Sequence, residues 1–196
     1  MELFPGAENS LSDREMLILS TALELFTQRG YFNTSVHDIH RSARVSIGSI
    51  YHYFKNKEGI AQALYSHLVD GMANVMDDID RENKTTHDRC RAAIEYLLKL
   101  AQSSPQAMQF ILYARHREFL PDEKPICSSR PFEKMKAMVK AGMETGEIRQ
   151  MDPTVASVSL FGGAIRLIHL WLDGVLNRPV SEYLDEIWAC AWRAVT

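Results

Sequence analysis

The sequence has few cysteines, and their positions suggest neither a cross-link nor a metal site. Three cysteines, Cys90, Cys127 and Cys190, occur in 196 residues, far apart and without a C-x-x-C pair. An odd and scattered set of this kind argues against a disulfide framework and against a zinc site. We therefore expect no metal and no other cofactor, and a reducing cytoplasm fits this cysteine usage best.

The pattern of a signal peptide and a long uncharged run are also lacking. The first ten residues carry Glu2 and Glu8, with no basic segment followed by an apolar core. The longest uncharged stretch, Pro153 to Ile165, has 13 residues and ends at Arg166, which is too short to span a bilayer. We expect a cytoplasmic protein without a membrane partner, and a disordered tail at residues 1–11.

Motifs of the common enzyme classes are missing as well. The chain contains no H-E-x-x-H, no G-x-S-x-G and no glycine-rich phosphate loop. His37 and His40 are spaced to share a metal on one helix face, but no third ligand stands near them in the sequence. We predict no catalytic residues and no metal site, so the chain is not expected to be an enzyme.

The formal net charge is -3, which is unusual for a protein that binds nucleic acid. The charge is unevenly distributed, however. Residues 29–57 hold five basic side chains and one acidic one, whereas the rest of the chain holds 17 basic and 24 acidic side chains. The net value therefore combines a basic segment, residues 29–57, with an acidic remainder of the chain. DNA should repel this acidic remainder.

Signals for strands are nearly absent, whereas signals for helix starts recur. Ser12 and Glu15 form a capping box, so a first helix is expected from Asp13 to Arg29, with Gly30 as its stop. About nine helices and no sheet are expected, which is an all-α fold. The later helices are predicted from Thr34 or Ser35 through Ser42, from Ile47 to about Tyr53, from Asn56 or Lys57 to about Asp80, across Cys90 to Ala101, after Ser104-Pro105, after Pro131, after Asp152-Pro153, and from Ser181 to near Val195.

The second and third predicted helices are short and are joined by a four-residue turn, Ala43 to Ser46. Helices of two turns gain little stability from propensity, and this arrangement on a longer helix is typical of a helix-turn-helix. The residues after the turn are rich in hydroxyl, imidazole and ammonium donors that phosphate oxygens accept from. Base edges could be contacted by Ile47, Ser49 or His52. A solvated polar helix with two core tyrosines is the alternative interpretation.

A known family shares these residues. The stretch from about Leu19 to Leu64, with its run SIGSIYHYFKNKE at residues 46–58, resembles the DNA-binding region of TetR-family transcriptional regulators. Phe26, Gly30-Tyr31, Thr34, Asp38-Ile39 and Ala43 match the family as well, and the resemblance covers roughly a quarter of the chain.

The resemblance implies a homodimeric regulator with a DNA-binding domain at residues 12–57 and a ligand-binding and dimerisation domain at residues 58–196. It implies that Thr34, Tyr51, Tyr53 and Lys57 contact phosphates, that Ser46, Ile47, Gly48, Ser49 and His52 face the groove of double-stranded DNA, and that Ile50 and Phe54 hold the recognition helix to the first helix.

Two residues depart from the family pattern. Arg44 stands where glycine is usual, and a left-handed arginine there costs on the order of 1 kcal/mol. Its side chain either reaches a phosphate or lies on the surface. His40 replaces a small residue, so the packing of its helix is expected to be looser or shifted.

The rest of the chain offers candidates for an interface and a pocket. Apolar residues on more than one helix face predict a two-fold four-helix interface, unless they form a buried core within one chain. The interface candidates are Gly162, Gly163, Leu167, Leu170, Ile187, Trp188 and Ala191. The candidates for an effector pocket, each of which could equally be core, are Met72, Met76, Tyr96, Phe110, Tyr113, Phe161 and Trp171.

The leading hypothesis is a homodimeric repressor that a small, largely apolar or aromatic ligand releases from a palindromic operator. The first alternative is a helical small-molecule-binding or adaptor module that does not bind DNA. The second is an activator, or a regulator that responds to a protein.

Overall fold

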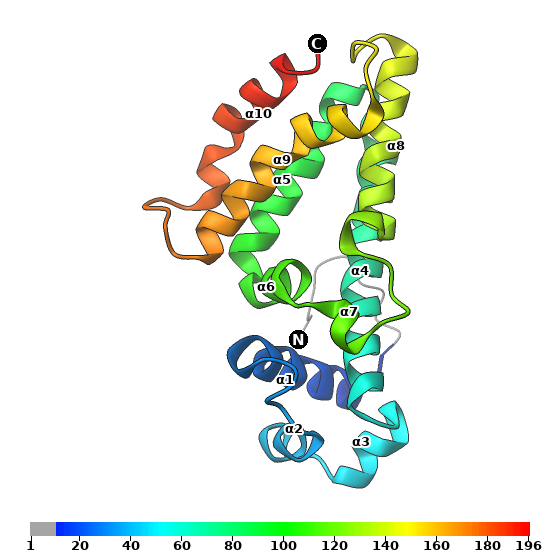
Figure 1. Ribbon diagram of the computed structural model, residues 1–196, viewed down its shortest axis with the longest axis vertical. Coiled ribbons are helices and arrows are strands. Elements are labelled where there is room, and N and C mark those ends of the chain that lie inside the picture. Colours follow the sequence, from blue (N-terminus) through cyan, green and yellow to red (C-terminus); the bar gives the residue numbers. More distant parts are fainter. Residues whose placement is uncertain (1–10) are drawn as a thin grey trace. The chain divides into compact units, whose positions relative to one another are not determined.

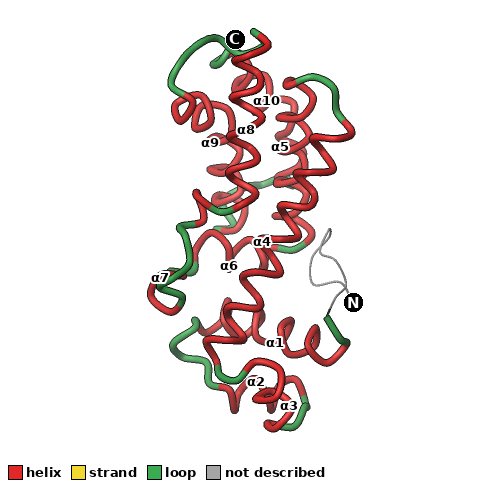
Figure 2. Tube along the Cα trace, turned by 90° about the vertical axis from the view of Figure 1, so that its right-hand side faces the viewer, coloured by secondary structure: helices red, strands yellow, loops and turns green. Residues whose placement is uncertain are grey.

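The computed structural model describes residues 11–196 (Figures 1 and 2). Within that range the chain forms ten α-helices, two short 3-10 helices and no strand. The prediction of an all-α fold is confirmed, with one helix more than the expected nine or so. The tail predicted at residues 1–11 falls, except for Leu11, outside the described residues.

The chain divides into two compact units. Among the described residues, the first contains residues 11–72 together with Gln106–Ser129, and the second contains Ala73–Pro105 together with Arg130–Thr196. The division falls inside α4 (Lys57–Glu82), which is continuous across it. The domain boundary expected between residues 57 and 58 stays a prediction.

The first unit begins with α1 (Asp13–Arg29), whose bounds are those predicted. The hydroxyl of Ser12 accepts from the N–H of Glu15, and the carboxylate of Glu15 accepts from the N–H of Ser12 at 2.9 Å. Gly30 ends the helix at φ 83°, which glycine adopts without a steric penalty. The face that includes Leu19, Ala22 and Phe26 is buried.

Two short helices follow, α2 (Val36–Ala43) and α3 (Ile47–Phe54) (Figure 1). Ser35, one of the two predicted caps, starts α2 in a capping box with Asp38. Ser46 caps α3 by accepting from the N–H of Ser49. Each helix buries only two side chains, so side-chain caps contribute much of what keeps helices this short folded.

Two further helices belong to the first unit, α6 (Pro105–Tyr113) and α7 (His116–Phe119), with the 3-10 helix η1 (Ile126–Ser128) after them. The ring of Phe110 on α6 stacks on Phe26 of α1 with centroids 6.2 Å apart. The ring of His116 lies 4.7 Å from Tyr65 of α4. The sequence did not predict α7, because a single helical turn has too few residues to show a period.

The second unit is a bundle of α5 (Thr86–Ser103), α8 (Arg130–Thr145), α9 (Pro153–Leu172) and α10 (Leu184–Arg193), which join the end of α4. Figures 1 and 2 show α5, α8 and α9 side by side. The expected start of the last helix at Ser181 is wrong. A 3-10 helix, η2 (Val180–Tyr183), stands there, and the Ser181 hydroxyl donates to the Gln102 side chain at 2.9 Å instead of capping α10.

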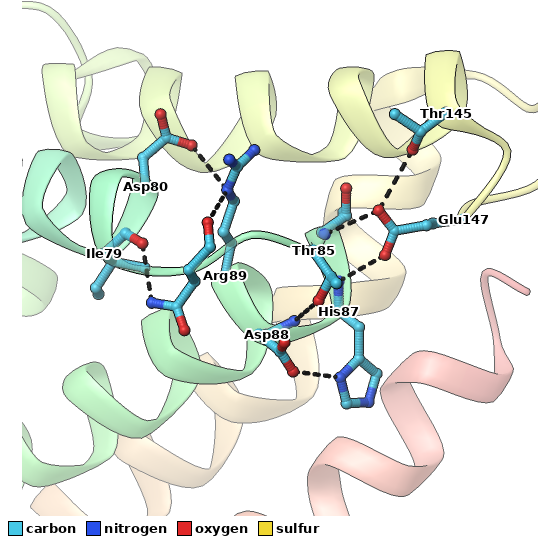
Figure 3. Close-up of polar contacts among 10 residues, drawn as sticks. Ile79, Asp80, Thr85, His87, Asp88, Arg89, Thr145 and Glu147 are labelled. Atoms are coloured by element: carbon cyan, nitrogen blue, oxygen red, sulfur yellow. Dashed lines mark hydrogen bonds and ion pairs between the residues drawn. The ribbon is translucent and has the colours of Figure 1, made fainter.

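The start of α5 is held by a carboxylate from the loop after α8 (Figure 3). Glu147 accepts from the backbone N–H groups of Thr86 and His87 at 2.9 and 3.2 Å. Partial desolvation acts to raise the pKa of Glu147, but these hydrogen bonds to its charged form outweigh it and leave the pKa below the ordinary value. Nearby, Arg89 donates to the backbone carbonyl of Asn83 at 2.9 Å and pairs with Asp80 at 3.2 Å.

Among the described helices, α9 is long and apolar enough to cross a membrane by length and composition alone. Arg166 lies within α9, so the helix extends beyond the 13-residue uncharged stretch counted in the sequence. The core helix of a soluble protein passes the same test when it is mostly buried, but here 28% of the most apolar window is buried. Val155 and Val158 are 54% and 65% exposed, so α9 presents apolar surface that the other described residues, within 11–196, do not cover.

Candidate functional site

The turn between α2 and α3 has the left-handed residue that the helix-turn-helix pattern requires. Arg44 adopts φ 54° and ψ 35°, so the backbone keeps this conformation without a glycine. The Nδ1 atom of His40 lies 3.1 Å from the carbonyl oxygen of Val45 and donates to it in the Nδ1-protonated tautomer. His40 therefore forms a hydrogen bond with the turn that contains the strained Arg44. The small residue usual at this position would have no side chain long enough to form this bond.

The recognition helix α3 has a buried side and an exposed side. Ile50 and Phe54 are buried, as the resemblance implied. Ser46, Gly48 and His52 are exposed, and Tyr51 is 48% exposed, whereas Ile47, Ser49 and Tyr53 are half-buried. The hydroxyl oxygens of Ser46 and Ser49 lie 2.8 Å apart, so part of their hydrogen-bonding capacity is used within the helix.

Two of the residues expected at phosphates are engaged inside the protein. Thr34 is 1% exposed, and its hydroxyl lies within hydrogen-bonding distance of the carbonyls of Gly30 and Leu25, at 3.0 and 3.3 Å. The Lys57 ammonium donates to the backbone carbonyls of Tyr31 and Thr34, at 3.1 and 3.0 Å. It also lies 4.1 Å from the centroid of the Tyr31 ring. Both side chains hold the loop before α2 in place.

The joint between α3 and α4 is tight, and sequence reasoning did not find it. Lys55 has φ 60° and ψ -45°, and the N–H of Asn56 donates to the carbonyl of Phe54 at 2.6 Å, which is a strained three-residue turn. The side chain of Asn56 then accepts from the N–H of Gly59 at 2.7 Å. A Cβ at Gly59 would lie 2.0 Å from the Phe54 carbonyl oxygen, so glycine is required there.

Positive charges flank the recognition helix α3. Arg44 and Lys55 are exposed, and α3 carries no acidic side chain. The one acidic residue of the 29–57 segment, Asp38, accepts hydrogen bonds from the hydroxyl and N–H of Ser35, which lower the pKa of its carboxyl. Asp38 also pairs with Arg41 at 3.3 Å. The arrangement suits a polyanion that approaches α3.

The described part of the chain contains no group of three or more histidine, cysteine or acidic side chains that could hold a metal. The rings of His37 and His40 lie 6.0 Å apart, and His40 is bonded to the turn. The geometry therefore offers the two histidines no third ligand among residues 11–196.

The candidates for the effector pocket are divided between the two units. Phe110 and Tyr113 line a cavity of about 400 Å³ in the first unit, where Met72 is buried. Met76, Tyr96, Phe161 and Trp171 belong to the second unit.

Within the second unit, Tyr96 is the most informative of these candidates. Its hydroxyl oxygen is buried and has no hydrogen-bond partner among the described residues, and burial raises the pKa of its phenol. The indole N–H of Trp171, by contrast, donates to the carbonyl of Ala101 at 3.2 Å.

Some of the interface candidates have partners within their own unit. Trp188 and Ala191 are buried, and the indole N–H of Trp188 donates to Nε2 of His87 at 3.1 Å. A Cβ at Gly163 would lie 2.7 Å from Ile187, so this glycine lets α9 and α10 of one chain approach. Gly162, Leu167 and Leu170 are half-buried on α9.

The comparisons with known proteins agree with this geometry. A family model described as "Bacterial regulatory proteins, tetR family" matches residues 18–64, which span most of α1, α2, α3 and the start of α4. The HTH-type transcriptional regulator YvkB of Bacillus subtilis is 32% identical over 177 residues, covering 86% of this chain and 89% of that protein.

Two further similarities extend over most of the chain. The fatty acid metabolism regulator protein of Bacillus subtilis is 25% identical over 173 residues, covering 80% of this chain and 82% of that protein. The crystal structure of FadR from Bacillus subtilis in complex with stearoyl-CoA superposes with a TM-score of 0.80 at 20% identity, covering 92% of this chain and 99% of that one. At this identity the superposition establishes a common fold.

Proposed function

Since the chain belongs to the TetR family of transcriptional regulators, which bind DNA through a helix-turn-helix and are not enzymes, we propose that it is a homodimeric repressor. In this proposal a small, largely apolar or aromatic ligand releases the dimer from a palindromic operator. Residues 12–57 bind DNA, and residues 58–196 bind the ligand and form the dimer.

The observation that carries the DNA-binding part is the exposed side of α3. Ser46 caps the helix, and the buried side chains of Ile50 and Phe54 anchor its inner face. The helix has no acidic side chain. Helices presented in this way enter the major groove with their N-terminal residues at the base edges. The groove contacts are assigned to Ser46, Ile47, Gly48, Ser49 and His52.

Phosphate contacts are assigned to Arg44, Tyr51 and Tyr53, which lie at or near the surface around α3. Thr34 and Lys57 receive a different role, because their polar groups are bonded to backbone carbonyls of the loop before α2. They position α2, and through it the turn and α3. Phosphates fix the register of the protein on the duplex, and the groove contacts provide sequence preference.

Homodimer formation is supported by the uncovered apolar surface of α9. The exposed Val155 and Val158 are three residues apart and share one face of the helix. Pairing α9 and α10 with the same helices of a second chain would bury this face in a four-helix interface. The two recognition helices would then enter successive major grooves about 34 Å apart.

The effector site is assigned to the second unit, around the buried hydroxyl of Tyr96. A buried hydroxyl without a partner is costly, and a ligand that offers a hydrogen-bond acceptor would remove that cost. Met76, Phe161 and Trp171 supply apolar surface in the same unit. Two of the named relatives are a fatty acid metabolism regulator and a FadR complex with stearoyl-CoA. Long-chain acyl-CoA is therefore the first ligand to test, with its acyl chain as the apolar part that the pocket would hold.

A salt titration of DNA binding tests the proposal. Purified protein is mixed with labelled duplex from the region upstream of its own gene, and affinity is measured between about 50 and 200 mM salt. Several neutralised phosphates require a steep decrease in affinity over this range. Absent or salt-insensitive binding would contradict the proposal and favour a module that binds ligands without binding DNA.

Three further measurements test the ligand, the effector site and the direction of regulation. Stearoyl-CoA should weaken DNA binding, and DNA should weaken stearoyl-CoA binding by the same factor, because coupling between two sites is reciprocal. Tyr96→Phe should reduce the ligand affinity with little effect on DNA affinity in the absence of ligand. A reporter gene transcribed with and without the protein distinguishes a repressor from an activator.

A further inference from the structure

A cavity of about 400 Å³ opens within the first unit, between the end of α1, the loop after it, and α6 and α7. Ligand pockets have volumes of roughly 300–1,000 Å³ and are lined mainly by apolar and aromatic side chains with a few polar groups. Six aromatic side chains line this space, which we call the aromatic cavity: Phe26, Tyr31, Phe32, Phe110, Tyr113 and Phe119.

Two of these rings are more exposed than aromatic side chains in a folded protein usually are. Phe32 is 64% exposed and Tyr113 is 43% exposed, whereas Phe26, Phe110 and Phe119 are buried. In the described part of the chain, Tyr51 is the third aromatic residue of this kind, and it lies on the recognition helix. Exposed aromatic surface around a concavity marks a place where another apolar group would be favoured.

The arrangement of the rings selects a flat occupant. The ring of Tyr31 stacks on Phe119, with centroids 4.0 Å apart and planes inclined by 14°. Phe32 stands edge-on to both rings, at 87° to Tyr31 and 84° to Phe119. Aromatic groups prefer such stacked and edge-to-face contacts, so a planar aromatic molecule could extend the cluster by lying against Phe32.

The cavity also has a polar edge. Gln109, Arg115 and Glu118 line it, and Arg115 pairs with Glu118 at 3.1 Å while its side chain stays 82% exposed. A guanidinium has five N–H donors, so one carboxylate leaves donors for a second acceptor. The ligand class that fits is therefore a flat aromatic molecule that carries an anionic or other hydrogen-bond-accepting substituent.

Tyr31 connects the aromatic cavity to the DNA-binding helices. Its hydroxyl donates to Glu58 at 3.0 Å, and its carbonyl accepts from Lys57 at 3.1 Å, so it is bound to the start of α4 at two points. Lys57 also donates to the carbonyl of Thr34, the residue just before the N-cap of α2. A molecule in the cavity would touch the residue that fixes the loop before α2.

We propose that the aromatic cavity is a second ligand site, distinct from the effector site around Tyr96, and that its ligand tightens DNA binding. A ligand that contacts Tyr31 in its bonded position favours the conformation in which α2 and α3 are held in place, and so shifts the population toward it. The effect on DNA rests on the DNA-binding function proposed above, but binding of the ligand does not. The sign is opposite to the release expected of the effector.

The test uses the full chain and the probe 1-anilinonaphthalene-8-sulfonate, which combines a planar naphthalene ring with an anionic sulfonate and whose fluorescence increases in apolar surroundings. Phe32→Ser removes an exposed ring of the cavity, and circular dichroism establishes that the variant is folded. Val175→Ser is the matched control, because Val175 is also 64% exposed but lies in the second unit. We expect Phe32→Ser to lower the affinity of one class of probe sites at least tenfold. Val175→Ser should leave the probe affinity of these sites unchanged. Equal binding by the wild type and Phe32→Ser would overturn the site.

A second arm measures DNA affinity with and without the probe. Wild-type protein should bind DNA at least threefold more tightly when the probe is present, and Phe32→Ser should not respond. Tyr31→Phe keeps the ring but loses the hydrogen bond to Glu58. This variant should still bind the probe, but the probe should increase its DNA affinity less than it does for the wild type. Weaker DNA binding in the presence of the probe would refute the stated sign. If the protein binds no DNA at all, the proposed function fails, whereas the Phe32→Ser comparison still decides whether the cavity binds the probe.

Discussion

The ammonium of Lys57 and the backbone carbonyl of Thr34 are joined by a hydrogen bond of 3.0 Å. Lys57 begins α4, and Thr34 precedes the N-cap of α2, so this bond joins the starts of two helices through residues that lie 23 positions apart in the chain. A second bond, to the carbonyl of Tyr31, uses another of the three ammonium donors. The positive charge of Lys57 therefore serves the internal structure of the DNA-binding helices.

We predict that Lys57→Met lowers stability and DNA affinity without changing how that affinity depends on salt. Two backbone carbonyls lose a charged donor, which should cost about 1–2 kcal/mol in the free energy of unfolding. A lost phosphate contact, by contrast, reduces the slope of log affinity against log salt by about 0.9. Denaturant unfolding and a salt titration of DNA binding measure the two quantities. A slope reduced by about one unit would show instead that Lys57 contacts a phosphate.

Arg44 allows the backbone and the charge of the turn to be separated. Arg44→Gly should raise the free energy of unfolding by about 0.5–1 kcal/mol, because glycine adopts the left-handed conformation without the Cβ clash. Arg44→Ala keeps the strained backbone and should not be stabilised. Both variants lose the guanidinium, so both should reduce the salt slope of DNA binding by about one unit if Arg44 contacts a phosphate. Equal stability of the two variants would contradict the strain at this position.

The parts of the fold that the sequence predicted are those with local signals. The capping residues Ser12 and Ser46 and the stop at Gly30 act on neighbouring residues, so they could be recognised without any tertiary information. The same holds for the buried positions of Ile50 and Phe54, which follow the helical period. The start of α10 was misplaced because Ser181 bonds to Gln102, which is distant in sequence.

The parts of the site that escaped prediction depend on contacts between distant segments. Lys57 looks like a surface cation in the sequence, and only the folded chain brings it to the carbonyls of Tyr31 and Thr34. The requirement for glycine at residue 59 likewise arises from the Phe54 carbonyl, which the strained turn at Lys55 brings close. The aromatic cavity combines α1 with α6 and α7, and the single turn of α7 gave no periodic signal.

The exposed face of α9 yields a prediction about assembly. Val158→Asp should raise the dissociation constant of the dimer more than tenfold, because an unpaired carboxylate would be buried in an apolar interface. Val175→Asp is the control, since the two valines are 65% and 64% exposed and Val175 lies after the end of α9. Sedimentation velocity over a range of concentrations measures both constants. Equal effects of the two substitutions would show that this face of α9 is not the interface.

The stability of the folded chain should depend on pH through His116. Its ring lies among Tyr65, Phe110 and Phe119, with centroids 4.7, 5.0 and 5.7 Å away, and its Nε2 atom is buried without a partner in the described part of the chain. Burial lowers the pKa of His116 to about 4, despite an opposing hydrogen bond with the backbone of Phe110. The unfolded chain, with a histidine pKa of about 6.5, therefore binds this proton at a higher pH than the folded chain does.

Because the folded pKa is the lower one, the contribution of His116 to stability is present above about pH 6.5 and is lost as the pH falls toward 4. We expect wild-type protein to lose about 2 kcal/mol more stability than His116→Phe between pH 7 and pH 4.5, a difference in which the other titrating groups largely cancel. Urea unfolding at the two pH values measures it. Phe119→Leu disturbs the same cluster without removing a titrating group, so it should lower stability without abolishing the pH dependence. A pH dependence that survives in His116→Phe would mean that the proton is taken up elsewhere.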